Sequence, residues 1–132
     1  MGISLRVDPD SGIVYITTSG SPSVDEQRDL WRQIGRLPGI RQPLRVLDDR
    51  RGLETFAETS DVRAARDFAA KISEWVRDTR IATVVPEAAA FGMARMFQAY
   101  SDDLPLELRA FYDYDEAERW LLDGSDPALP VD

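Results

Sequence analysis

The sequence of 132 residues contains no cysteine and no histidine, and both absences restrict its chemistry. Without cysteine there is no disulfide, no thiol nucleophile and no thiolate metal site. Without histidine the commonest general base and the commonest metal ligand are missing. The sequence also has no nucleophile elbow, no glycine loop that cradles phosphate and no metal-ligand spacing. These absences favour a non-catalytic protein that uses no metal and no cofactor.

Positive charge is scarce relative to negative charge. The chain has 16 Lys and Arg against 24 Asp and Glu, which gives a formal net charge of −8. Nucleic acids and anionic membranes bind clustered cations, so both are disfavoured as partners. No apolar run approaches the ~20 residues of a membrane span, and the first ten residues lack the apolar core of a signal peptide. We therefore expect a cytoplasmic protein.

Patterning predicts one domain over residues 1–122 and a flexible tail over residues 123–132, which lack periodicity. Period-two alternation and β-branched residues indicate five strands, while apolar residues at helical spacing indicate four helices. The strands are expected at residues 3–8, 13–20, 43–49, 80–87 and 106–112. The helices are expected at residues 21–39, 61–78, 88–103 and 113–122.

Local signals define several ends of these elements. The turn "PDSG" joins the first two strands into a hairpin. Ser23, with Glu26 three residues later, forms a capping box that begins the first helix. Ser60 is the expected N-cap of the second helix.

The order ββαβαβαβα predicts an α/β fold, in which the hairpin leads into parallel βα units of a five-stranded mixed sheet. A sheet covered on both faces would have strands that are apolar almost throughout. Here one face carries a polar set: Ser4, Arg6, Tyr15, Arg45 and Arg109. We therefore expect the helices to lie mainly on one face, and the partly open second face is a candidate interface.

Three segments carry a likeness to a known family: "RVLDDRRGLETF", "RIATVVPEAAAFGMARMFQAY" and "LELRAFYDYDEAERWLL". With the element order, they resemble the STAS or SpoIIAA-like domains, and more narrowly the bacterial SpoIIAA-like family related to STAS and CRAL-TRIO proteins. The resemblance covers about residues 3 to 122. It implies strands in sequential order, without the topological switch point where ligands usually bind, and a binding or regulatory role.

The resemblance makes Ser60 a candidate phosphoacceptor. In anti-sigma-factor antagonists of this fold, a serine in an Asp-Ser-Ser-Gly-Leu stretch is phosphorylated at the start of the second helix. Residues 58–62 read Glu-Thr-Ser-Asp-Val, so Ser60 matches the second serine. A phosphate there would gain from the helix dipole but would lie beside Glu58 and Asp61. The alternative is a structural N-cap, which the acidic neighbours favour.

Asp48, Asp49, Arg50 and Arg51 lie at the carboxyl end of the third strand and form a candidate contact for a partner or an anion. The carboxylates could hold Mg²⁺, or the arginines could bind an anionic ligand. The alternative is a solvated turn whose charges neutralise one another in pairs. We favour the turn, because adjacent carboxylates on a strand project to opposite sides and make a poor metal site.

Met93, Met96 and Phe97 form a soft apolar surface on the third helix, suited to an apolar ligand or an interface. The CRAL-TRIO relationship makes a lipid pocket worth considering, although spacing of i, i+3 and i+4 is also that of ordinary core residues.

Two functional hypotheses follow. The first is a non-catalytic regulatory or protein-interaction module whose partner is another protein or a second copy in a homodimer. The second is a small carrier of an apolar ligand or lipid.

Overall fold

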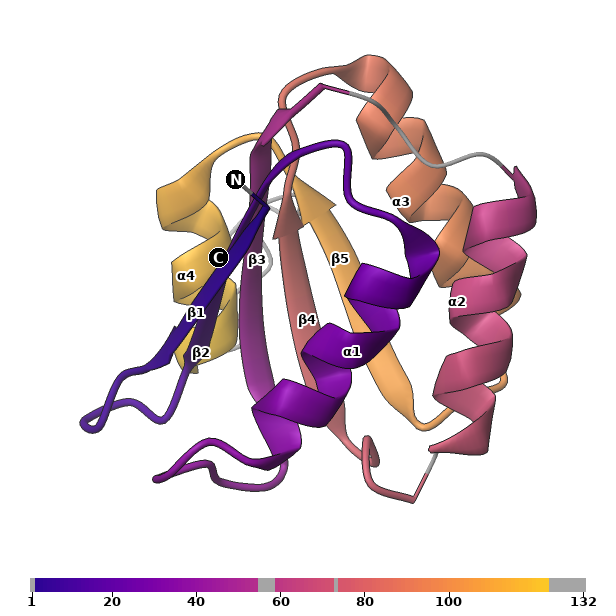
Figure 1. Ribbon diagram of the computed structural model, residues 1–132. Coiled ribbons are helices and arrows are strands. Elements are labelled where there is room, and N and C mark those ends of the chain that lie inside the picture. Colours follow the sequence, from indigo (N-terminus) through magenta and orange to yellow (C-terminus); the bar gives the residue numbers. More distant parts are fainter. Residues whose placement is uncertain (1, 55–58, 73, 124–132) are drawn as a thin grey trace, which may run out of the picture.

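The computed structural model describes residues 2–54, 59–72 and 74–123, which form one five-stranded sheet with four helices (Figure 1). The elements in chain order are β1 (Ile3–Val7), β2 (Val14–Gly20), α1 (Val24–Gly35), β3 (Arg45–Leu53), α2 (Thr59–Lys71), β4 (Thr79–Val84), α3 (Ala88–Tyr100), β5 (Leu106–Phe111) and α4 (Tyr114–Asp123). The predicted order ββαβαβαβα is confirmed. Of the predicted tail, all but Asp123 lies outside the described residues.

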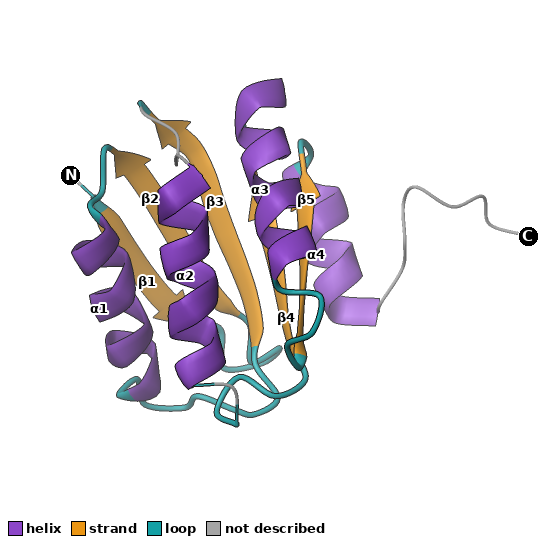
Figure 2. Cartoon of the chain, turned by 90° about the vertical axis from the view of Figure 1, so that its right-hand side faces the viewer, coloured by secondary structure: helices purple, strands orange, loops and turns teal. Residues whose placement is uncertain are grey.

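The strands lie in the sheet in their sequence order, β1-β2-β3-β4-β5. β1 is antiparallel to β2, and every later pair is parallel. Each of α1, α2 and α3 connects two adjacent parallel strands. Because such crossovers are right-handed and the strands advance in one direction, all three helices lie on the same face (Figure 2).

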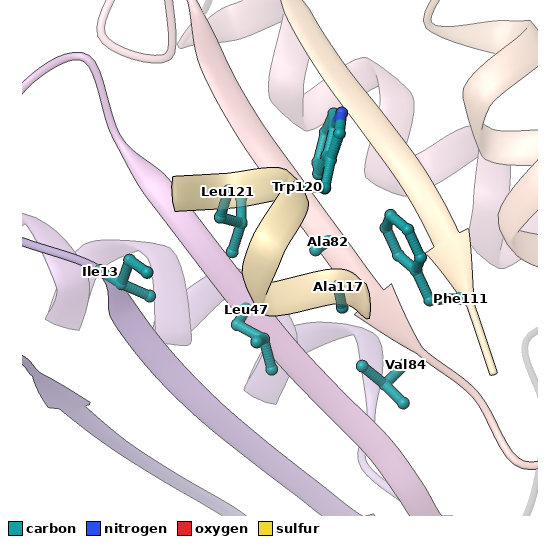
Figure 3. Close-up of a cluster of buried hydrophobic side chains, with 8 residues drawn as sticks. All are labelled: Ile13, Leu47, Ala82, Val84, Phe111, Ala117, Trp120 and Leu121. Carbon is teal, nitrogen blue, oxygen red and sulfur yellow. The ribbon is translucent and has the colours of Figure 1, made fainter. Parts of the chain in front are cut away.

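α4 follows the last strand, so no crossover restricts it, and it packs on the opposite face. There Ala117, Trp120 and Leu121 meet sheet residues in a buried cluster completed by Ile13, Leu47, Ala82, Val84 and Phe111 (Figure 3). The expectation of helices mainly on one face is confirmed. The open part of the second face is smaller than the polar pattern suggested, because α4 covers parts of β3, β4 and β5.

Two polar residues of this face, Arg6 and Tyr15, form a cluster with Glu118 of α4. Tyr15 on β2 donates a hydrogen bond from its hydroxyl to Glu118 Oε2 on α4, at 2.7 Å. Arg6 on β1 lies over the Tyr15 ring, 4.1 Å from its centroid. Burial raises the pKa of Tyr15 above 10, and the bond to Glu118 raises it further. This cluster connects the N-terminal hairpin to the last helix.

The capping box of α1 is confirmed: Ser23 Oγ accepts from the Glu26 backbone, and Glu26 Oε1 accepts from the Ser23 backbone. The predicted bounds of α2 are wrong at both ends. Ser60 is not the N-cap, because the helix already includes Thr59. The helix ends at Lys71 rather than at Asp78, because the chain enters a turn in which Trp75 packs edge-on against Trp31 and Asp78 has a left-handed backbone (φ 62°).

Candidate ligand-binding cavity

A partly open cavity of about 200 Å³ lies between the sheet and the helices α1, α2 and α3. Its lining comes from both layers and is mostly apolar. The lining residues are Gln27, Arg28, Trp31, Asp48, Arg50, Leu53, Val62, Ala65, Phe68, Ala69, Ile72, Val76, Ile81, Thr83, Val85, Met93, Ala94, Phe97, Leu106 and Leu108.

The apolar wall arises from the periodicity of α2 and α3. The stripe of α2 supplies Phe68 and Ala69, and the stripe of α3 supplies Met93 and Phe97. α2 packs against its neighbouring helices α1 and α3, as Figure 2 shows. Met93 and Phe97 were singled out from the sequence for an apolar ligand, and both line the cavity. Met96 is half-buried and is not among the lining residues.

The cavity also has a polar end, formed by β3 and the first half of α1. Asp48 Oδ2 accepts from Arg50 Nη1 at 3.0 Å, and Asp48 Oδ1 accepts from Thr18 Oγ1 at 3.1 Å. The side chains of Asp48 and Arg50 are 13% and 19% exposed, so this ion pair is largely shielded from water. Arg50 Nη2 also makes a long contact of 3.4 Å with Gln27 Oε1.

Arg28 on α1 contributes a second guanidinium to the cavity lining. Its Nε is buried and has no hydrogen-bond partner among the described residues. Its Nη1 lies 3.9 Å from Asp25 Oδ1, whose side chain is 94% exposed, so that ion pair is long and solvated. A buried donor without an acceptor is costly, and here the donor belongs to a residue that lines the cavity.

The predicted charged turn at residues 48–52 is wrong, because these residues belong to β3, which continues to Leu53. The expected charge pairing is present in another form. Alternate strand residues share a face, so Asp48 pairs with Arg50 on the cavity side. Asp49 pairs with Arg51 through contacts of 2.9 and 2.8 Å. Hydrogen bonding to Arg51 holds the pKa of Asp49 below its ordinary value of 3.8.

This alternation separates the four candidate contact residues into two pairs. Asp48 and Arg50 line the same cavity as Met93 and Phe97. From the sequence alone, these two pairs are separate candidate sites. The guanidinium of Arg51 lies 5.3 Å from the Tyr114 ring centroid at the start of α4. The two carboxylates therefore do not converge on one cation, as expected for neighbours on a strand.

A wider depression of about 470 Å³ lies beside Arg51 and is lined also by Tyr112, Asp113, Tyr114 and Asp115. Its lining is mainly polar and it is broadly open to solvent. Arg51 is already engaged by Asp49, and Asp113 Oδ1 accepts from the Glu116 backbone at 3.1 Å. An open polar depression excludes little water, so the smaller, apolar cavity is the better candidate for a ligand.

The remaining candidate, Ser60, lies in the first turn of α2, and its side chain is outside what the structure describes. Its phosphorylation stays a prediction. Gln27 and Arg28 were missed by sequence reasoning, although a signal for them exists. They lie four and three residues before Trp31 on α1, at positions of helical spacing where an amphipathic helix often places apolar residues.

No family model matches the sequence, and no curated protein matches it. A solved structure does resemble the fold: an uncharacterised protein of the DUF3478 family from Shewanella loihica PV-4, described as having a SpoIIAA-like fold. It superposes with a TM-score of 0.62 over 91% of this chain and 94% of that chain, at 17% sequence identity. This chain has a SpoIIAA-like fold.

The resemblance read from the sequence is thus confirmed at the level of the fold, including the sequential strand order. In this SpoIIAA-like fold the cavity lies between the helical layer and the sheet, and not at a topological switch point of the sheet. Within the described ranges, no helix combines the length and apolar character needed to cross a bilayer.

Proposed function

We propose that this protein is a non-catalytic binding module that holds a small apolar molecule in the cavity beneath α2 and α3. The observation that carries the proposal is the cavity itself, which lies against Met93 and Phe97. Native interiors have few voids larger than a water molecule. The cavity is partly open, so water has access to its apolar lining, and a bound apolar molecule would remove that lining from water.

The volume limits the size of the ligand. An engineered apolar cavity of about 150 Å³ takes one benzene molecule. A cavity of about 200 Å³ therefore suits a ligand of roughly eight non-hydrogen atoms. A two-chain lipid is far larger, so we propose a small single-chain or single-ring molecule.

The lining supports binding rather than catalysis. It contains no Ser, Cys, His or Lys among the described residues, so the usual nucleophiles and general bases are missing. Asp48 is the lining carboxylate, and it already accepts hydrogen bonds from Arg50 and Thr18. The proposed role is therefore storage, transport or sensing of the ligand.

The protein-interaction hypothesis has weaker support, because it relied on two surfaces that differ from expectation. Residues 48–53 are strand rather than an exposed turn, and α4 covers part of the second sheet face. A homodimer stays a prediction, which light scattering on the purified chain tests directly.

The test of the proposed function is a titration of the full chain with 1-hexanol, followed by amide chemical shifts. We expect saturable binding, with the largest shifts around Phe68, Met93 and Phe97. Ala69→Leu introduces a larger side chain into the cavity and should abolish these shifts. Ala99→Leu, at an exposed position of α3, is the matched control and should retain them. Absence of binding, or equal binding by both variants, would refute the proposal.

A further inference from the structure

The polar end of the cavity carries more positive than negative charge. Asp48 and Arg50 neutralise each other at 3.0 Å. Arg28 then contributes a second positive charge, whose ion-pair partner among the described residues is the exposed Asp25, at 3.9 Å. Both guanidinium groups belong to residues that line the cavity. The site therefore combines an apolar body with one excess cation at its end.

We propose that the ligand carries a carboxylate at one end and that this group binds at Arg28, beside Arg50. The inference rests on the proposed function, since it concerns the same cavity and adds the chemistry of the ligand. The carboxylate would accept hydrogen bonds from the guanidinium of Arg28, a residue that lines the cavity. The apolar body would extend between Met93, Phe97 and the sheet.

A monoanion fits this end better than other charged groups. One negative charge balances the one excess cation, whereas a dianionic phosphate would add an unmatched charge close to Asp48. An ammonium group would face Arg28 as a like charge, and Asp48 already accepts bonds through both oxygens. A planar carboxylate also matches the planar fork of donors that a guanidinium presents.

The acidity of the whole protein does not oppose this assignment at close range. The net charge is −8, but exposed charges are largely screened beyond about 8 Å at physiological ionic strength. A direct contact with Arg28, whose side chain is 41% exposed, lies well within that distance. The global charge affects how often an anion encounters the protein more than how firmly it is held.

Three probes with the same six-carbon chain separate the head group from the apolar body: hexanoate, 1-hexanol and hexylamine. At neutral pH the first is an anion, the second is neutral and the third is a cation. We expect hexanoate to bind about tenfold tighter than 1-hexanol, the effect of one charge-assisted hydrogen bond. Hexylamine should bind most weakly. Calorimetric titration of the full chain measures all three dissociation constants.

The variant Arg28→Met removes the guanidinium and keeps an apolar stem. Arg32→Met is its matched control. Arg32 lies one turn later on α1, pairs with Asp29 at the same long distance of 3.9 Å and is not among the lining residues. The advantage of hexanoate over 1-hexanol should disappear in Arg28→Met and persist in Arg32→Met. Binding of 1-hexanol should change less than twofold in Arg32→Met.

The outcomes separate this inference from the proposed function. If 1-hexanol binds and hexanoate binds no tighter, or if Arg28→Met keeps the full advantage, the carboxylate assignment is wrong while the apolar site stands. If none of the three probes binds, the proposed function fails and the assignment fails with it. If Arg28→Met does not fold, the ranking of the probes in the unmodified protein still decides the question.

Discussion

Ala69→Leu provides the sharpest test of whether real space exists beneath α2. Ala69 is 9% exposed and lines the cavity. Leucine adds three carbon atoms, which would contribute about 2.4 kcal/mol at about 0.8 kcal/mol per buried methylene. Lost rotamer freedom removes about 0.5–1 kcal/mol of this gain. We therefore expect a net stabilisation of about 1–2 kcal/mol.

A closely packed site would give the opposite sign. Adding methylene groups to a filled core costs about 1–3 kcal/mol, because neighbouring side chains must move. Equilibrium urea denaturation followed by circular dichroism distinguishes the two cases. With a urea dependence near 2 kcal/mol per M, the midpoint should rise by roughly 0.7 M. The exposed control Ala99→Leu should change stability by less than about 0.5 kcal/mol. A midpoint that falls in Ala69→Leu would refute the cavity.

The opposite sheet face gives two further predictions. Trp120→Ala should lower the free energy of unfolding by about 3–5 kcal/mol, because Trp120 is 3% exposed in the buried cluster beneath α4. Urea denaturation measures this loss. A loss below 1 kcal/mol would show that α4 is not firmly packed. In the folded protein Tyr15 has a pKa raised above 10. The stability that its protonated hydroxyl contributes is therefore fully present below pH 10 and is lost as the pH rises further. Tyr15→Phe should therefore flatten the alkaline decline of stability measured between pH 9 and 11, and an unchanged decline would contradict the Tyr15–Glu118 contact.

The regular parts of the fold could be predicted because their signals are local. Alternation placed the strands, and the capping box at Ser23 and Glu26 placed the start of α1. The terminal Ala, Trp and Leu pattern identified the face by which α4 packs. Each of these signals depends on neighbours in sequence rather than on distant contacts.

The continuation of β3 could not be read in this way, because Asp-Asp-Arg-Arg-Gly has the composition of a turn. Pairing at i, i+2 neutralises the charges on each face, and the end of β2 supplies partners for Gly52 and Leu53. A Cβ at Gly52 would lie 3.1 Å from Ser19 Cβ, so the close approach of the strands favours glycine there. The contacts with β2 are long-range and leave no local pattern in the sequence of β3.

The candidate site was predictable in its parts but not as a whole. Met93 and Phe97 were found on α3, and Asp48 and Arg50 were found on β3. Their meeting depends on how three helices lie over the sheet, which periodicity does not specify. Arg28 was overlooked because a charged residue on a helix is usually solvated, and its buried Nε becomes apparent only in three dimensions.

The most direct test of the account is a crystal structure of the full chain with hexanoate. The account predicts density for the alkyl chain between Phe68, Met93 and Phe97, with the carboxylate within hydrogen-bond distance of the Arg28 guanidinium. A structure in which α2 and α3 close directly on the sheet, or in which hexanoate lies elsewhere, would contradict it.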